Sequence, residues 1–203
     1  MMNARSRLFR AILAVATTLA ASDALAAPAV YDLDPNHTYP SFEADHMGGL
    51  STWRGKFNSS SGKVVLDRAA GTGTVEVRID VASIDFGNEK LNEHARSADM
   101  FDAARFPVAT YTGRLAKFVS GAPTEVQGEL TLKGVTQPVV LQVDRFLCKP
   151  NPATGKEVCG ADATATIDRA AFGVDLGKAY GFDMKTLLRI QVEGIRADAP
   201  DAR

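Results

Sequence analysis

Three histidines, His37, His46 and His94, are the side chains of this sequence that are best suited to holding a metal ion. A catalytic zinc ion takes three protein ligands and keeps one position open, so their number would suffice. Their spacing argues against such a site, because neither an HExxH nor an HxH motif occurs. His46 falls on the same strand face as Phe42 and Ala44. We interpret it either as a hydrogen-bonded interior histidine or, together with His94, as a polar contact to the head of an otherwise apolar ligand.

Other catalytic arrangements find little support. The sequence has no GxSxG nucleophile elbow and no glycine-rich phosphate loop before a helix. Asp99 and Asp102 are close enough in sequence to act as a carboxylate pair. A simpler interpretation places them in a short helical turn, where the helix dipole favours acidic residues. The sequence therefore predicts no catalytic residue, no metal site and no enzymatic activity.

The two cysteines, Cys148 and Cys159, flank a turn-rich segment between two predicted strands. Across a hairpin of an exported protein, such a pair is expected to form a disulfide. In the chain-entropy model a bridge that closes a loop of this size contributes about 3 kcal/mol. The alternative, a redox pair or a soft-metal site, lacks both a CxxC spacing and a third soft ligand. We expect the disulfide to stabilise the hairpin without joining a ligand site.

Residues 1–26 have the pattern of a cleavable signal peptide. Arg5, Arg7 and Arg10 precede an apolar run, and residues 24–26 (ALA) form a small-x-small cleavage site. The run is too short to span a bilayer. We expect cleavage after Ala26, a periplasmic location and one domain over residues 27–203. Without residues 1–26 the formal net charge changes from −1 to −3, which gives no electrostatic reason to expect nucleic-acid binding.

Apolar and polar residues alternate with the period of a half-buried strand through most of residues 39–193. The clearest case is the series Val75, Val77 and Ile79. Roughly eight to ten such segments, joined by short turns, indicate an antiparallel sandwich or a closed barrel. Small side chains recur on the predicted inward faces and favour a hollow barrel, although tightly packed sandwich sheets use them too: Gly55, Gly113, Gly128, Ala161, Ala163 and Ala165.

The alternation stops over residues 83–107, which we name the lid. Residues 89–96 suit a short helix, and Ser97 is expected to cap a further turn that carries Asp99. Met100, Phe101 and Phe106 are then expected to close one end of whatever the strands enclose. The alternative is a crossover loop held in place by aromatic anchors.

Several motifs resemble those of the YceI-like family. They are YDLDPNHT (31–38), FEADH (42–46), GKF (55–57), SID (83–85), HARSADMFD (94–102), FP (106–107), GELTLKGVTQPV (128–139) and IDR (167–169) with FG (172–173). The resemblance implies a lipocalin-like, eight-stranded antiparallel β-barrel, exported, with an apolar tunnel for a lipid. The ligand types associated with the family are ubiquinone-like molecules, polyprenyl chains and long-chain amides. No enzymatic activity is established for the family as a class.

The chain also departs from its relatives. It has Leu91 and Asn92 where many carry an Arg-Asp pair, and Met100 where they often have Phe, so a head contact from that pair is not expected here. A flexible thioether would suit an adaptable apolar contact.

The predicted function is that of a lipid carrier, a monomer or homodimer that takes no resident cofactor and contacts membranes transiently for ligand exchange. The alternative is an enzyme or electron-transfer accessory that acts on a quinone or isoprenoid through the histidines and the lid carboxylates. The predicted ligand-binding residues are Phe42, His46, Phe57, His94, Met100, Phe101, Phe106, Tyr111 and Leu130.

Overall fold

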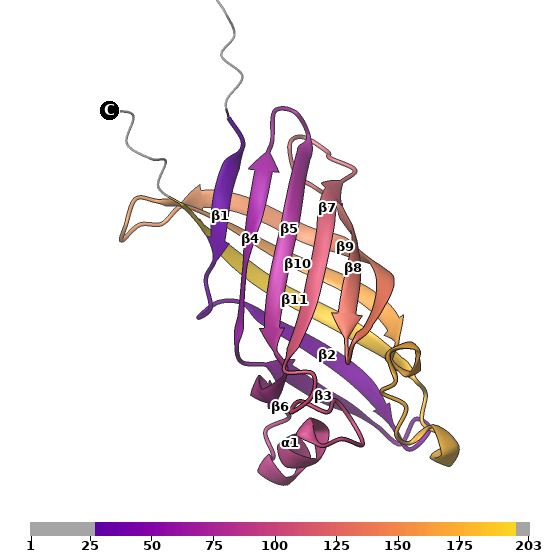
Figure 1. The fold of residues 1–203 in the computed structure, drawn as a ribbon. Coiled ribbons are helices and arrows are strands. Elements are labelled where there is room, and N and C mark those ends of the chain that lie inside the picture. The colour runs from indigo at the N-terminus through magenta and orange to yellow at the C-terminus, as the bar shows by residue number, and fades with distance from the viewer. Residues whose placement is uncertain (1–26, 198–203) are drawn as a thin grey trace, which may run out of the picture.

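The computed structural model describes residues 27–197, which are mostly β-strand (Figure 1). The predicted signal peptide lies outside these residues. The strands are β1 (Ala29–Leu33), β2 (Tyr39–His46), β3 (Ser51–Phe57), β4 (Ser60–Asp67), β5 (Thr72–Asp80), β6 (Ile84–Asp85), β7 (Val108–Ala116), β8 (Glu125–Leu132), β9 (Val135–Pro150), β10 (Glu157–Asp168) and β11 (Lys185–Arg196). The helices are α1 (Glu89–Arg96) and the 3₁₀ turns η1 (Val81–Ser83), η2 (Arg169–Phe172) and η3 (Lys178–Tyr180). No helix in the described part of the chain is long and apolar enough to cross a membrane.

Eight of the strands close into an antiparallel barrel in the order β1-β4-β5-β7-β8-β9-β10-β11. Closure occurs where β1 pairs with the C-terminal part of β11, with Tyr31 opposite Arg196. The N-terminal part of β11 pairs instead with β2, where Leu188 lies opposite Phe42. Along one edge, β11 thus pairs with two different strands, first with β2 and then with β1. This architecture confirms the predicted barrel and excludes the sandwich.

The strands β2, β3 and β6 gather with α1 at one end of the barrel, which we call the lid end (Figure 1). The loop between β2 and β3 meets the segment around η3 there, since Gly48 approaches the carbonyl oxygen of Gly181. The opposite end, called the far end, carries the β9–β10 hairpin.

Residues 89–96 form α1 as predicted. The side chain of Asn88 caps its first turn by accepting a hydrogen bond from the backbone N–H of Leu91 (3.3 Å). The expectation that the Ser97 side chain caps a further turn was wrong. Ser97 is the C-cap of α1, and its hydroxyl donates to the carbonyl oxygen of His94 (2.7 Å). The free carbonyls of the last helical turn need such donors. The predicted turn does follow, and the backbone N–H of Met100 donates to the carbonyl oxygen of Ser97 (3.1 Å).

The β8–β9 hairpin shows how the sequence sets strand register. Lys133 and Gly134 both adopt positive φ, 50° and 76°, and connect the paired residues Leu132 and Val135. A two-residue turn of this kind matches the twist of the flanking strands. The strand after the turn therefore starts at Val135.

Candidate functional site

The barrel encloses an apolar cavity of about 630 Å³. This volume falls in the range of pockets that bind small molecules. Every inward residue of β11 from Thr186 to Gly194 borders the cavity, so it runs along the strand for roughly 26 Å at about 3.3 Å per residue. The wall includes aliphatic side chains from most of the strands, such as Val75, Leu130 and Ile190. A space of this shape and polarity suits a long apolar molecule.

Most of the predicted ligand-binding residues border this cavity. They are Phe42, His46, Phe57, His94, Met100, Phe101, Tyr111 and Leu130. They come from β2, β3, α1, the segment after α1, β7 and β8, which the barrel brings around one space. Their contact with a ligand stays a prediction.

Phe106 lies elsewhere. It is not among the residues that border the cavity, and its ring packs against Gly134 in the β8–β9 turn. A Cβ atom at Gly134 would come within 2.8 Å of the Phe106 ring, so only glycine leaves room for it. Phe106 therefore anchors the end of the lid to the barrel rim. Of the three residues that were predicted to close one end of the barrel, only Met100 and Phe101 border the cavity.

Aromatic rings surround the lid end of the cavity. The imidazole of His46 stacks on Trp53 with ring centroids 4.2 Å apart and meets the edge of Phe182 at 5.2 Å. Phe42 contacts Phe57 at 5.9 Å and Phe86 at 5.4 Å. Such tilted and edge-to-face pairs are favourable geometries for aromatic side chains. The contacts place these rings together at the lid end of the cavity.

Two charged side chains, Arg169 and Asp45, also border the lid end of the cavity. Both are hydrogen-bonded to backbone groups. The guanidinium of Arg169 donates to the carbonyl oxygens of Val174 (2.7 Å) and Leu176 (2.9 Å), and burial lowers its pKa. The carboxylate of Asp45 accepts from the N–H groups of Asp183, Gly49 and Gly48, which hold its pKa below its usual value. These bonds fix the loops that frame the opening.

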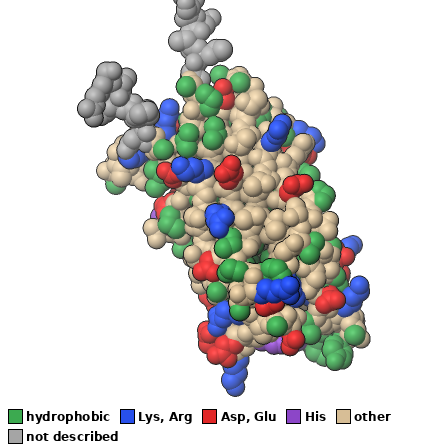
Figure 2. Space-filling model, in the orientation of Figure 1, with side chains coloured by type: hydrophobic (Ala, Val, Ile, Leu, Met, Phe, Trp, Pro, Cys, Tyr) green, Lys and Arg blue, Asp and Glu red, His purple; other side chains and the backbone are tan. Residues whose placement is uncertain are grey.

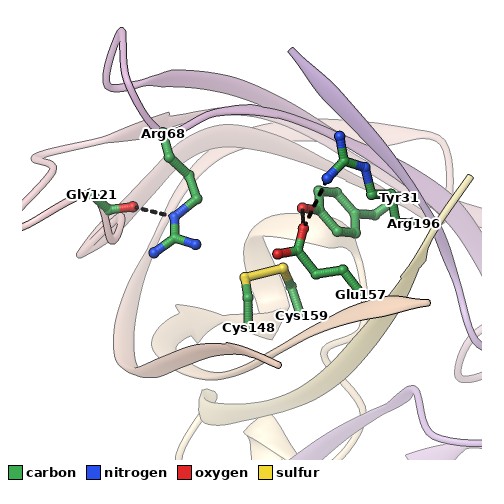
Figure 3. Close-up of a disulfide and its surroundings, with 7 residues drawn as sticks. All are labelled: Tyr31, Arg68, Gly121, Cys148, Glu157, Cys159 and Arg196. Atoms are coloured by element: carbon green, nitrogen blue, oxygen red, sulfur yellow. Dashed lines mark hydrogen bonds and ion pairs between the residues drawn. A yellow bond between two sulfur atoms is a disulfide. The ribbon is translucent and has the colours of Figure 1, made fainter. Parts of the chain in front are cut away.

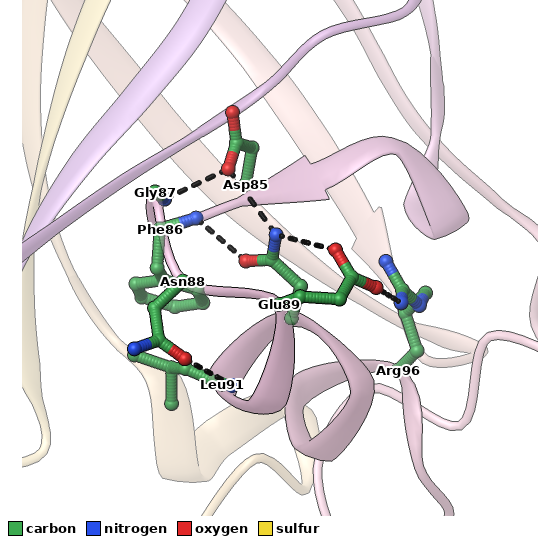
Figure 4. A network of polar contacts seen from close by, with 8 residues as sticks. Asp85, Phe86, Gly87, Asn88, Glu89, Leu91 and Arg96 are labelled. Carbon is green, nitrogen blue, oxygen red and sulfur yellow. Dashed lines mark hydrogen bonds and ion pairs between the residues drawn. The ribbon is translucent and has the colours of Figure 1, made fainter.

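Asn92, one of the two residues that replace the Arg-Asp pair of many relatives, has a structural role. Figure 4 shows its neighbours Asp85, Phe86 and Glu89. Its buried amide accepts from the N–H of Phe86 (2.7 Å) and donates to Asp85 (3.2 Å). It thereby fastens the loop between β6 and α1. The neighbouring Leu91 borders the cavity and supplies apolar surface there. At these two positions the chain offers the cavity a hydrocarbon side chain rather than a charge.

The hydroxyl of Tyr111 lies within the barrel wall. It donates to the carbonyl oxygens of Val139 (2.9 Å) and Val126 (3.2 Å), and burial raises the pKa of the phenol to about 12. The group is therefore neutral at physiological pH and already hydrogen-bonded. Tyr111 offers the cavity its ring rather than a reactive oxygen.

The disulfide joins Cys148 on β9 to Cys159 on β10, as predicted (Figure 3). Cys159 borders the cavity at the far end and packs with Tyr31 and Leu66. That the bond does not join the ligand site stays a prediction. Tyr31 donates to Glu157 (2.5 Å), which also accepts from Arg196 (3.5 Å). Burial and this hydrogen bond raise the pKa of Tyr31 to about 12. The hairpin is thus tied to the strands that close the barrel.

The other residues considered for catalysis or metal binding lie away from the cavity. His37 pairs with Asp34 (2.7 Å) on the surface, and neither Asp99 nor Asp102 borders the cavity. Within residues 27–197 no group of three His, Cys, Asp or Glu side chains could hold a metal ion.

Sequence reasoning missed Trp53, Phe182 and Thr186, which also border the cavity. Trp53 and Thr186 continue alternations that the sequence shows, whereas Phe182 reaches the site only through the loop between η3 and β11.

Replacing Phe101 by Ala is expected to speed the release of a bound lipid several-fold with a small loss of ligand-free stability. Phe101 borders the cavity, is only partly buried and meets Phe57 at 6.0 Å. Truncating a Phe in a solid core would instead cost about 3–5 kcal/mol. Bound lipid and the denaturation midpoint, measured on ligand-free and loaded samples, separate the two. A large stability loss without any effect on lipid retention would contradict the cavity-closing role.

The fold and the site define a class of protein, a closed antiparallel barrel around an elongated apolar cavity. Comparisons with known proteins agree. A family model described as a YceI-like domain matches residues 31–194. A UPF0312 protein of Azotobacter vinelandii is 32% identical over 181 residues, covering 88% of this chain and 92% of that protein. Protein YceI of Escherichia coli is 32% identical over 179 residues, covering 87% and 91%. The chain belongs to the YceI-like family.

Solved structures show the same fold. Burkholderia cenocepacia BcnA aligns with a TM-score of 0.62 and 25% identity over 79% of this chain and 98% of that one. A polyisoprenoid-binding domain from Saccharophagus degradans aligns with a TM-score of 0.59 and 18% identity over 82% and 98%.

Proposed function

We propose that this protein binds a long-chain isoprenoid or quinone-like lipid and sequesters or carries it within the barrel. The observation that carries the proposal is the elongated apolar cavity. Burial of each CH₂ group is worth about 0.8 kcal/mol, so a long chain can bind tightly with little polar recognition. The structural neighbour described as polyisoprenoid-binding supports this choice of ligand.

A binding role accounts for the site better than catalysis. Arg169 and Asp45 are occupied by backbone groups, and Tyr111 is neutral and hydrogen-bonded. The enzyme alternative relied on His46 and His94 together with the lid carboxylates. The two histidines border the cavity, but the carboxylates do not. We further propose that the protein acts in the periplasm, as its N-terminal sequence suggests.

The proposal includes exchange of the ligand at a membrane surface. Exposed apolar side chains gather at the lid end on the β2–β3 loop and around η3, among them Leu50 (73% exposed) and Tyr180 (81%). Figure 2 shows hydrophobic side chains clustered at the lower right, where η3 lies in Figure 1. Leu176 and Tyr180 also border the cavity, so this exposed apolar surface is continuous with its interior. A lipid could pass between a bilayer and the barrel without crossing water.

The ligand is tested by extracting freshly isolated protein with organic solvent and identifying the extract by mass spectrometry. A near-stoichiometric long-chain isoprenoid or quinone is the expected result. Protein that contains no lipid, and that binds none after incubation with prenyl alcohols or quinones, would reject the function.

The exchange surface is tested with the double variant Leu50→Ser and Tyr180→Ser. We expect transfer of bound lipid to phospholipid vesicles to slow by at least about fivefold, since a loss of about 1 kcal/mol of apolar contact has this effect. Lipid occupancy should stay unchanged. Leu147→Ser is the matched control, because Leu147 is equally apolar and 59% exposed but lies near the far end. Equal transfer rates for all three proteins would rule out exchange through this surface.

A further inference from the structure

One buried hydroxyl on a residue that borders the cavity lacks a partner. Thr186 is 6% exposed, and within residues 27–197 its Oγ1 is the buried side-chain oxygen or nitrogen that forms no hydrogen bond. Thr186 starts the inward series of β11, which continues through Leu188 and Ile190, and it borders the cavity. Its cross-strand neighbours are Ala44 on β2 and Ile167 on β10. None of these apolar side chains can accept or donate a hydrogen bond.

The other hydroxyl groups that border the cavity, apart from that of the exposed Tyr180, are hydrogen-bonded. Thr38 donates to the carbonyl oxygen of Glu193 (3.2 Å) and accepts from its N–H (3.3 Å). Ser41 donates to Tyr39 (3.2 Å), and Tyr111 donates to Val139 (2.9 Å). Buried polar groups in proteins almost always find a partner, and an exception calls for an explanation. A group supplied by a ligand is the partner that this position can still receive.

The place of Thr186 along the cavity gives the orientation of that ligand. His46 is the next inward residue of β2 after Ala44, the cross-strand partner of Thr186, so imidazole and hydroxyl lie at the same end. The side chains of His46 and His94 form no hydrogen bond with the described residues, although His46 stacks on Trp53. From Thr186 toward the far end the inward residues of β11 are Leu188, Ile190, Val192 and Gly194.

We infer that the Thr186 hydroxyl hydrogen-bonds an oxygen-bearing head group, a hydroxyl or a carbonyl, of the lipid in the cavity. The head group then lies at the lid end between Thr186 and His46, and the hydrocarbon tail extends toward the far end. Thr186 is thus a specificity-determining residue that favours an oxygenated chain over a plain hydrocarbon. The inference rests on the proposed function, and it names the ligand's polar group and its orientation.

The test compares two probes on delipidated protein, geranylgeraniol and the C20 hydrocarbon that carries hydrogen in place of its hydroxyl. In Thr186→Val, which replaces the hydroxyl with a methyl group, we expect about tenfold weaker binding of the alcohol, as for one lost hydrogen bond. Binding of the hydrocarbon should stay within twofold of the wild type. Thr186→Ser keeps the hydroxyl and should bind both probes as the wild type does, within threefold.

The ligand-free Thr186→Val protein should be at least as stable as the wild type, because it removes a hydroxyl that has no partner. Equal weakening of both probes would show that Thr186 acts through packing, and an unchanged affinity for the alcohol would show no role; either result overturns the inference and leaves the proposed function standing. Failure of the wild type to bind either probe would overturn both.

Discussion

Replacing Ala163 by Phe is expected to weaken lipid binding by more than about 100-fold while leaving the stability of the ligand-free barrel nearly unchanged. Ala163 is buried on β10, borders the cavity and lies between Val143 on β9 and Ile190 on β11. A phenyl ring at this position would occupy the middle of the space that a ligand needs. In a filled core the same substitution would overpack the interior and destabilise the protein by about 1–3 kcal/mol.

The control is Thr166→Phe, which adds the same ring to the same strand on its exposed, outward face. That variant should bind lipid as the wild type does. Lipid bound per mole of protein and the urea midpoint, measured on all three proteins, give the answer. Normal lipid occupancy in Ala163→Phe would mean that the ligand lies elsewhere, and a large stability loss would mean that the barrel is not hollow.

Removing the disulfide with Cys148→Ala and Cys159→Ala is expected to lower the free energy of unfolding by about 3 kcal/mol. The bond joins directly opposite residues of β9 and β10 and closes a loop with a sequence separation of 11. For a protein of this size the melting temperature should fall by roughly 6–12 °C. Alanine avoids the hydroxyl that serine would add to the apolar wall beside Cys159.

Lipid occupancy at 25 °C should stay near normal in the double variant, since Cys159 is one of many apolar residues along the cavity. Wild-type protein treated with a reductant serves as the control and should melt near the same temperature as the variant. A change below about 1 kcal/mol, or two free thiols in protein isolated from the periplasm, would contradict a stabilising disulfide.

The barrel could be predicted where the chain follows local rules. The alternation of Val75, Val77 and Ile79 places those residues on the cavity side, with Glu76 and Arg78 exposed. Alternation alone left a sandwich and a barrel open, because the choice depends on pairing between β1 and β11. That contact joins residues at opposite ends of the domain, and only the family resemblance pointed to it.

The site was predictable where a large apolar residue continued a strand pattern, as for Phe42 and Phe57. Thr186 continues an equally clear strand pattern. Because its side chain is polar, it was not predicted to face the interior of the barrel. The prediction that Phe106 helps to close the cavity was wrong for a different reason. It was grouped with its sequence neighbours Met100 and Phe101, whereas the turn that receives it lies beyond two further strands. Local sequence can show that a ring is buried but not which of two surfaces buries it.

The pairing of β1 with β11 also sets the order in which this molecule can fold. Hairpins such as β8–β9 and β9–β10 can form as soon as both of their strands are available, because their loops are short. The seam between Tyr31 and Arg196 joins the first and the last strand of the described part of the chain. Contacts of such long sequence separation form slowly, since the intervening chain must first be ordered. The cavity, and with it any bound lipid, can exist only after the last strand has joined the first.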